Sequence, residues 1–122
     1  PFGREVPTIR DLVADIHHRE GVEAAVVLGR VGLLVDGQTV PDLDSERIAA
    51  HVPSILQCAD ELGSASARGA LRTAVLEYEA GLAIVAAMSP DALLLVLARR
   101  TANLGQLLYE LRRNRASIAA LV

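Results

Sequence analysis

Three short segments of this sequence are almost entirely apolar, at odd and even positions alike. They are residues 22–28, 82–88 and 92–98. Successive side chains of a strand point to opposite faces of its sheet, so a strand that is apolar at both parities needs cover on both faces. The sequence therefore predicts a sheet with helices, or a partner chain, on either side.

A short amphipathic helix is predicted ahead of the first of these strands. Thr8, with Asp11 three residues later, forms a capping pattern at its start, and Gly21 marks its end. The apolar residues that share one face of this helix are Ile9, Leu12, Val13 and Ile16.

A hairpin is predicted next. Residues 22–28 and 31–35 are apolar strands, and the Gly-Arg pair at 29–30 makes a tight connection between them. The Asp-Gly pair at 36–37 is a turn signal that closes the second strand.

A long central helix is predicted over residues 44–62. Asp44 or Ser45 can cap its start, and Gly63 is a stop signal. The apolar positions at helical spacing are Ile48, Val52, Ile55, Leu56, Ala59 and Leu62. Pro53 lies inside this pattern, and because proline lacks a backbone donor and clashes with the preceding turn, we expect a local bend there.

Three consecutive strands are predicted after a linker of small residues. They are residues 70–79, 82–88 and 92–98, separated by turn residues at 79–81 and 89–91. Connections this short make neighbouring strands antiparallel, so the three should form a meander.

A last helix is predicted to begin at Asn103, with Gln106 three residues later as its capping partner. Its apolar positions are Leu104, Leu107, Leu108, Leu111 and Ile118. The predicted order is α-β-β-α-β-β-β-α. We expect one α/β domain of the α+β type over residues 1–122, with an ordered core of about 8–120 and a five-stranded antiparallel sheet flanked by helices on both faces.

The segment 70–79 is the most polar of the five predicted strands. Its polar positions are Arg72, Thr73, Glu77 and Glu79. It is therefore predicted to lie at an edge, where its free backbone groups and remaining apolar side chains favour pairing with a second copy of the chain. The predicted dimer interface consists of Leu71, Thr73, Val75, Leu76 and Glu77, with Ile55 of the central helix.

A mildly polar shoulder follows the apolar stripe of the central helix. Its members are Arg47, His51, Ser54 and Cys58. We interpret this shoulder as a surface for binding a partner protein. The alternative is an ordinary solvated flank of the helix.

Composition bears on the compartment and on the partners. The formal net charge is −3, without the concentrated basic face that nucleic-acid binding requires. Cys58 is the single cysteine, which excludes an internal disulfide and suits a reducing compartment. No apolar run approaches the roughly 20 residues of a membrane span, and the residues ahead of the first helix do not have the pattern of a secretion signal. We therefore expect a cytoplasmic protein with no nucleic-acid partner and no membrane span.

No combination of residues predicts a catalytic centre, a metal site or a cofactor site. His17 and His18 are adjacent on a helix and point about 100° apart, so they cannot bind one metal ion together. The glycines of the hairpin lie between two strands, whereas a phosphate-binding loop lies between a strand and a helix. Cys58 has no adjacent basic residue and is expected to pack as a small apolar side chain.

Two charged groups each have more than one interpretation. The acidic group is Asp36, Asp42, Asp44 and Glu46. It could attract a cation, but its spacing is not that of a calcium loop, and helix capping in a solvated loop is preferred. The basic group is Arg112, Arg113 and Arg115. It could contact a phosphate, a GTPase or a membrane surface, although arginines at the end of a helix also complement the helix dipole.

Two segments carry a resemblance to a known family. They read GVEAAVVLGRVGLLVDG at 21–37 and TANLGQLLYELRRN at 101–114. With this order of elements the chain resembles the bacterial members of the roadblock/LC7 family from about Thr8 to Val122. The positions that match the family's last helix are Asn103, Leu104, Gly105, Tyr109, Glu110, Arg112 and Arg113. The chain departs from the family pattern at Pro53 and in the short turn after Val35.

The resemblance implies a homodimer, in which the third strands form one continuous sheet and the central helices lie together on one face. It also implies a small Ras-like GTPase as partner, whose nucleotide hydrolysis or localisation the dimer modulates without a catalytic residue or cofactor of its own. Two alternatives remain open. One is a dimerisation scaffold with no GTPase contact, and the other is a small-molecule sensor of the PAS or GAF kind.

Overall fold

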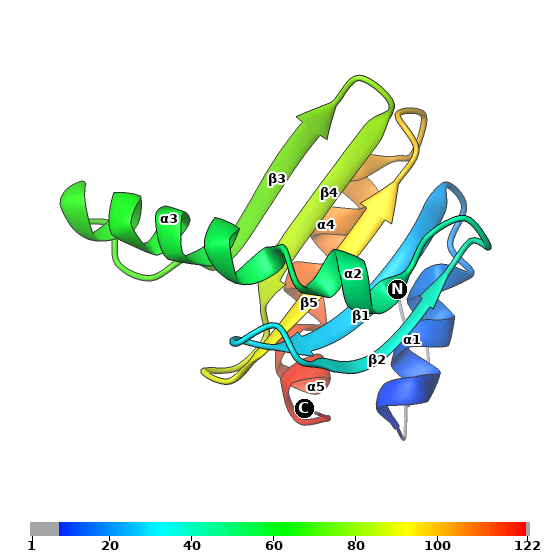
Figure 1. Ribbon diagram of the computed structural model, residues 1–122, viewed down its shortest axis with the longest axis horizontal. Coiled ribbons are helices and arrows are strands. Elements are labelled where there is room, and N and C mark those ends of the chain that lie inside the picture. Colours follow the sequence, from blue (N-terminus) through cyan, green and yellow to red (C-terminus); the bar gives the residue numbers. More distant parts are fainter. Residues whose placement is uncertain (1–7, 122) are drawn as a thin grey trace.

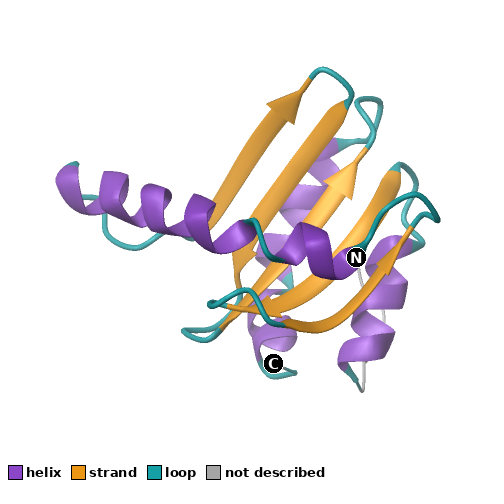
Figure 2. Ribbon diagram, in the orientation of Figure 1, coloured by secondary structure: helices purple, strands orange, loops and turns teal. Residues whose placement is uncertain are grey.

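One five-stranded antiparallel sheet organises the computed structural model, which describes residues 8–121 (Figure 1). Helices cover both faces of this sheet (Figure 2). The elements are α1 (Ile9–His17), β1 (Val22–Gly29), β2 (Leu34–Thr39), α2 (Ser45–Ala49), α3 (Val52–Ala65), β3 (Thr73–Tyr78), β4 (Gly81–Ala87), β5 (Ala92–Ala98), α4 (Leu104–Arg113) and α5 (Arg115–Ala119). The predicted fold class is confirmed.

The two edges of the sheet are β2 and β3. The strand order is β2-β1-β5-β4-β3, so the last three strands are neighbours in the order in which they occur along the chain. Val75 of β3 pairs with Ile84 of β4, and Leu82 of β4 pairs with Ala98 of β5. The predicted meander and the predicted edge position of the third strand are both confirmed.

Side chains on the two faces of the sheet form separate hydrophobic cores. Ile84 belongs to the core on the side of α1, α4 and α5, and its neighbour Val85 belongs to the core on the side of α2 and α3. Both side chains are fully buried, as are Leu93 and Leu94 of β5, which alternate in the same way. Cover on both faces therefore explains why these strands are apolar at both parities.

Local hydrogen bonds cap three helices where the sequence predicts it. Thr8 Oγ1 accepts from the backbone N–H of Asp11 at 3.1 Å, and Asn103 Oδ1 accepts from that of Gln106 at 3.0 Å. Asp44 caps α2 through a 3.0 Å hydrogen bond from the backbone N–H of Glu46. Each cap satisfies a donor that the first turn of a helix leaves without an intrahelical partner.

The predicted central helix is in fact two helices. α2 ends at Ala49 and α3 begins at Val52, so Pro53 lies in the first turn of α3. A proline removes no helical hydrogen bond there, and a break between two helices accommodates it where we expected a bend within one. α3 continues beyond Gly63, so the predicted stop at that residue is wrong. The last predicted helix is likewise divided, at Asn114, into α4 and α5.

The second strand lies further along the chain than predicted. β2 begins at Leu34, and Asp36 and Gly37 lie within it, so the prediction that they close the hairpin is wrong. Val26 and Val27 of β1 pair with these two residues. Because β1 is buried, its backbone groups need partners along its whole length, and this requirement outweighs the local turn preference of Asp-Gly.

A substitution at Gly63 tests how closely the loop before β3 approaches α3. A Cβ atom at position 63 would collide with the carbonyl oxygen of Gly69. Gly69 itself has a positive φ of 82°, a conformation that favours glycine. Alanine ordinarily stabilises a helix interior relative to glycine, but this collision should reverse the sign. We expect Gly63→Ala to lower the free energy of unfolding by about 1–2 kcal/mol in urea denaturation.

The neighbouring exposed residue Ser64 provides the control for this experiment. Ser64→Ala should leave the free energy of unfolding within about 0.5 kcal/mol of the unaltered chain. A Gly63→Ala variant as stable as the Ser64→Ala variant would contradict the prediction.

Candidate protein-interaction surface

The edge strand β3 has a neighbour on one side only. It pairs with β4 over its whole length, from Thr73 to Tyr78, and within residues 8–121 no strand lies on its other side. Val75, in the middle of the strand, is 39% exposed. The free side of β3 therefore offers backbone donors and acceptors, together with an apolar side chain, to a further strand.

The predicted interface residues divide between the two faces of β3. Leu71 and Leu76 are half-buried against the core beneath α2 and α3. Thr73 lies on the opposite face, where its hydroxyl accepts a 3.0 Å hydrogen bond from Arg115 of α5. Glu77 shares the parity of Thr73 and is exposed. Four of the six predicted residues therefore lie in the edge strand and Leu71 lies just before it, and their role in self-association stays a prediction.

The C-terminal half of α3 extends beyond the sheet. α3 crosses β4 and β3 near the start of β3 and continues past the edge of the sheet (Figure 1). Val52 and Leu56, in the first half of the helix, are buried, whereas Leu62 near its end is 70% exposed. We call residues 59–65 the α3 overhang. Its exposed leucine was predicted from helical spacing to lie in the core, and that prediction is wrong.

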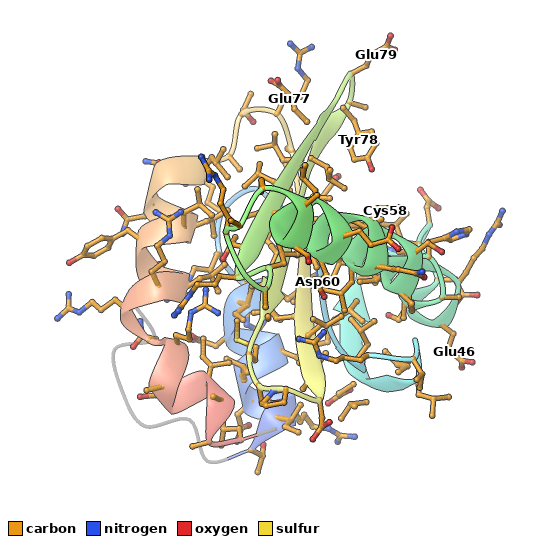
Figure 3. The ribbon with its side chains drawn as sticks, turned by 90° about the vertical axis from the view of Figure 1, so that its left-hand side faces the viewer. Glu46, Cys58, Asp60, Glu77, Tyr78 and Glu79 are labelled. Carbon is orange, nitrogen blue, oxygen red and sulfur yellow. The ribbon has the colours of Figure 1, made fainter. Side chains whose placement is uncertain are left out.

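Asp60 fixes the direction of the overhang. One of its carboxylate oxygens, Oδ1, accepts a 2.8 Å hydrogen bond from the backbone N–H of Leu71, just before β3. The other, Oδ2, lies 3.7 Å from Nη1 of Arg30, in the connection between β1 and β2. Asp60, labelled on α3 in Figure 3, thus joins the helix to two other parts of the chain.

An apolar groove of about 390 Å³ lies between the first half of α3 and the sheet, where β3 ends and β4 begins. Its apolar lining includes Ile48, Ile55, Leu76, Leu82 and Leu97. Two polar-tipped side chains, His51 and Tyr78, stand at its rim and are exposed. The predicted interface residue Ile55 thus lies in this groove, away from the edge of β3 itself.

The predicted partner-binding shoulder is exposed along α2 and α3. Its members Arg47, His51, Ser54 and Cys58 are all exposed, and His51 also lines the groove. The prediction that Cys58 packs as a small apolar side chain is wrong, because its side chain lies on the outside of α3 (Figure 3). The partner-binding role of the shoulder stays a prediction.

Two exposed apolar side chains were missed by the sequence interpretation. Val31 and Leu33 lie in the connection between β1 and β2 and are largely exposed. The sequence placed them inside a strand, because the second strand was predicted too early. The two glycines at 29 and 32, close together, were the signal for a longer turn.

Neither a metal site nor a membrane span is found in the described part of the chain. Within residues 8–121, no three His, Cys, Asp or Glu side chains are grouped so that they could hold a metal ion. No helix over the same range combines the length and the apolar character needed to cross a membrane.

A sequence model of the Roadblock/LC7 domain matches residues 8–98, from the cap of α1 to the end of β5. The chain belongs to the Roadblock/LC7 family. The matched range contains the whole sheet, the edge strand and the overhang, whereas α4 and α5 lie beyond it. These features of the candidate surface are therefore part of a Roadblock/LC7 domain.

Solved structures agree with this assignment. The Roadblock/LC7 domain from Streptomyces avermitilis superposes with a TM-score of 0.82 and 24% identity, covering 93% of this chain and 96% of that chain. The gliding protein MglB from Thermus thermophilus gives a TM-score of 0.80 at 16% identity, covering 92% and 86% respectively. An MglB structure with a tetrameric arrangement gives 0.81 at 17%, covering 92% and 85%. At these identities the likeness establishes a shared fold.

Proposed function

We propose that this Roadblock/LC7 domain is a homodimeric regulator or adaptor of a small Ras-like GTPase, acting in the cytoplasm. The observation that carries the proposal is the free edge of β3 beside the α3 overhang. A GTPase is proposed as the partner because the chain belongs to a family whose members are partners of such GTPases. In this proposal the domain supplies no catalytic centre and acts by binding.

Antiparallel pairing of β3 with β3 of a second copy would satisfy the free backbone groups of both strands. It would continue the sheet across the dimer and place both α3 helices on the same face. The MglB structure with a tetrameric arrangement is a precedent for self-association among similar proteins. A two-fold dimer of this kind is also the commonest symmetry of protein oligomers.

The overhang and the groove are complementary in such a dimer. α3 leaves the sheet near the start of β3 (Figure 1), whereas the lining of the groove includes Tyr78 at the end of β3. Antiparallel pairing brings the start of one β3 beside the end of the other. Leu62 in the overhang of one copy would thus be carried toward Leu76 and Leu82 in the groove of its partner. Each copy would cover apolar surface that the other leaves exposed.

The shoulder is the proposed contact for the GTPase. Arg47, His51, Ser54 and Cys58 are exposed on the face that carries α2 and α3. Because the two-fold axis places both shoulders on one side of the dimer, they would form one continuous surface, and a single GTPase could contact both copies.

Binding and single-turnover GTP hydrolysis by a Ras-like GTPase of the same organism test the proposal. We expect the domain to bind the GTPase, and to change its rate of hydrolysis if it acts as a regulator. Arg47→Glu on the shoulder should weaken binding by about tenfold, since a charge reversal in an interface opposes association. Arg100→Glu, an exposed site after β5, is the matched control and should leave binding unchanged.

The absence of both binding and a change in turnover would overturn the GTPase role. Partners captured by the dimer that include no GTPase would instead favour the second candidate, a dimerisation scaffold. Both functions use the same self-association, so the free edge of β3 supports either of them.

A further inference from the structure

Four arginines gather at the start of β3. Arg72 comes directly before the strand, Arg112 and Arg113 end α4, and Arg115 begins α5. They surround an open depression of about 870 Å³, which we call the arginine cleft. Its lining is completed by Thr73, Met88, Ala116 and Ala119. The cleft lies at the free edge of the sheet, on the face opposite α3.

The positive charge of the arginine cleft has no counter-charge in the described part of the chain. Within residues 8–121, no carboxylate forms an ion pair with any of the four guanidinium groups. Arg115 donates to the backbone oxygen of Ala87 and, at 3.0 Å, to Thr73 Oγ1, so neutral acceptors hold it in place. Burial, and then the positive charges of Arg72 and Arg112, lower the pKa of Arg115. A chain with a net charge of −3 thus carries a concentrated site for an anionic group.

The opposite end of the same strand is acidic. Glu77 and Glu79 are exposed at the end of β3 and in the turn that follows it, and Figure 3 shows both near the tip of the hairpin, above Tyr78. Ala74 and Leu76 pack toward α3, so alternation along the strand places Thr73 and Glu77 on the other face, which is that of the arginine cleft. The edge strand therefore begins beside a basic site and ends in an acidic one, on one face of the sheet.

Symmetry restricts how two such strands can pair. A two-fold axis normal to the sheet keeps equivalent faces on the same side, and directly opposite residues of antiparallel strands point to the same face. Opposite positions must therefore both be odd or both be even. The two registers with the greatest overlap are centred on Val75 and on Leu76. The first places Glu77 of the partner copy directly opposite Thr73, and the second brings Glu79, in the turn after the partner's β3, close to Thr73.

We propose that in the homodimer the acidic end of each β3, Glu77 and Glu79, occupies the arginine cleft of the other copy. The inference rests on the proposed homodimer and adds the contact that fixes its strand direction and register. Both registers bring a partner carboxylate beside Thr73, and hence beside Arg115 and Arg72. A second copy is favoured as occupant over a free anion because its charges are complementary and its position is continuous with the β3 edge.

The same contact excludes the competing arrangement. Parallel pairing of the same two free edges would place the start of one β3 beside the start of the other and would turn one copy over, so the two arginine clefts would lie on opposite faces of the joined sheet. Neither cleft would then receive the acidic end of the partner strand. The distribution of charge along β3 thus selects the antiparallel dimer.

A pair of charge-reversed variants of the full chain tests this contact. The cleft variant carries Arg72→Glu, Arg112→Glu and Arg113→Glu, and leaves Arg115 in place because it ties α5 to the sheet. The tip variant carries Glu77→Arg and Glu79→Arg. Each variant alone opposes like charges at both contacts of its homodimer. A mixed dimer of the two restores opposite charges at both contacts.

Analytical ultracentrifugation and native mass spectrometry measure the outcome. We expect the dissociation constant of each variant's homodimer to rise at least about tenfold, and less at high salt. Mixing the two should restore a dimer of mixed mass, and this recovery would itself show that both variants are folded. Arg10→Glu and Glu20→Arg are the controls: each reverses one charge of the corresponding sign at an exposed position away from β3, and each should dimerise as the unaltered chain does.

The result separates this inference from the proposed function. If the unaltered chain is monomeric, the homodimer itself fails. If the unaltered chain dimerises and either variant alone dimerises equally well, the contact is overturned while the homodimer stands. Variants that dissociate and do not form a mixed dimer would also overturn it.

Discussion

Val75→Asp should convert the proposed homodimer into a monomer. Val75 lies in the middle of β3 and is exposed beside the free edge. In one of the two favoured registers the new carboxylate faces its own symmetry copy, and in the other it faces Glu77 of the partner. Both place two like charges opposite each other at the centre of the interface, where water is excluded. We expect the dissociation constant to rise by about 100-fold or more, because such contacts cost several kcal/mol.

Sedimentation velocity over a range of concentrations measures this change. Val35→Asp is the matched control, since Val35 is a valine on the other edge strand, β2, and is 54% exposed. Val35→Asp introduces the same charge and lowers the strand propensity by the same amount as Val75→Asp, but at an edge that we do not expect to join two copies. A dimer lost in Val35→Asp and retained in Val75→Asp would identify β2 as the joining edge and contradict the proposed dimer.

Glu110→Ala should destabilise the fold by about 2–4 kcal/mol, somewhat less than the roughly 3–5 kcal/mol lost when a fully buried ion pair is broken, because the Arg19 side chain is 23% exposed. Glu110 is 3% exposed. Its Oε2 atom accepts hydrogen bonds from Arg19 Nη1 at 2.7 Å and from Gln106 Nε2 at 3.2 Å. Arg19 follows α1, so this carboxylate joins the start of the domain to α4. Its loss leaves the partly buried guanidinium of Arg19 without its closest anion, although Asp15 lies 3.8 Å away.

The effect of this substitution should depend on pH. Burial on its own would raise the pKa of Glu110, but the pKa is lowered overall, and the hydrogen bond from Gln106 and the charge of Arg19 are among the causes. A carboxyl group with a lowered pKa in the folded state stabilises the fold above its unfolded pKa, and the contribution is lost as pH falls through the lower folded value. The difference in unfolding free energy between Glu110→Ala and the unaltered chain should therefore be full at neutral pH and shrink in acid.

Urea denaturation at a series of pH values measures both effects. Glu20→Ala, which removes an exposed glutamate next to Arg19 in sequence, is the control and should change stability by no more than about 0.5 kcal/mol. A Glu110→Ala variant no less stable than this control at neutral pH would show that the Arg19 contact contributes little.

The features that could be predicted from the sequence are those set by near neighbours. Thr8, Asp44 and Asn103 cap their helices through bonds to residues two or three positions away, so sequence spacing alone reveals them. The covered sheet followed from apolar residues at both parities of its strands. The edge position of β3 followed from the polar residues that interrupt it.

The errors arise where distant parts of the chain decide the local structure. Asp36 and Gly37 resemble a turn, but pairing with β1 extends the strand through them. Leu62 fits the helical spacing of a core position, yet it is exposed because α3 extends past the edge of the sheet before this residue (Figure 1). The arginine cleft joins Arg72 to Arg112, Arg113 and Arg115, and nothing in their separate segments indicates that α5 returns to the start of β3.

The double attachment of Asp60 has a kinetic consequence. Because this carboxylate holds α3 to both Leu71 and Arg30, the overhang is already oriented in a single copy, and meeting a second copy requires little ordering of the chain. Rigid partners of this kind associate at about 10⁵–10⁷ M⁻¹s⁻¹, and charge steering raises that rate. For the proposed homodimer, encounter of two copies should then be fast, and the lifetime of the dimer should be set by how slowly the two β3 edges separate.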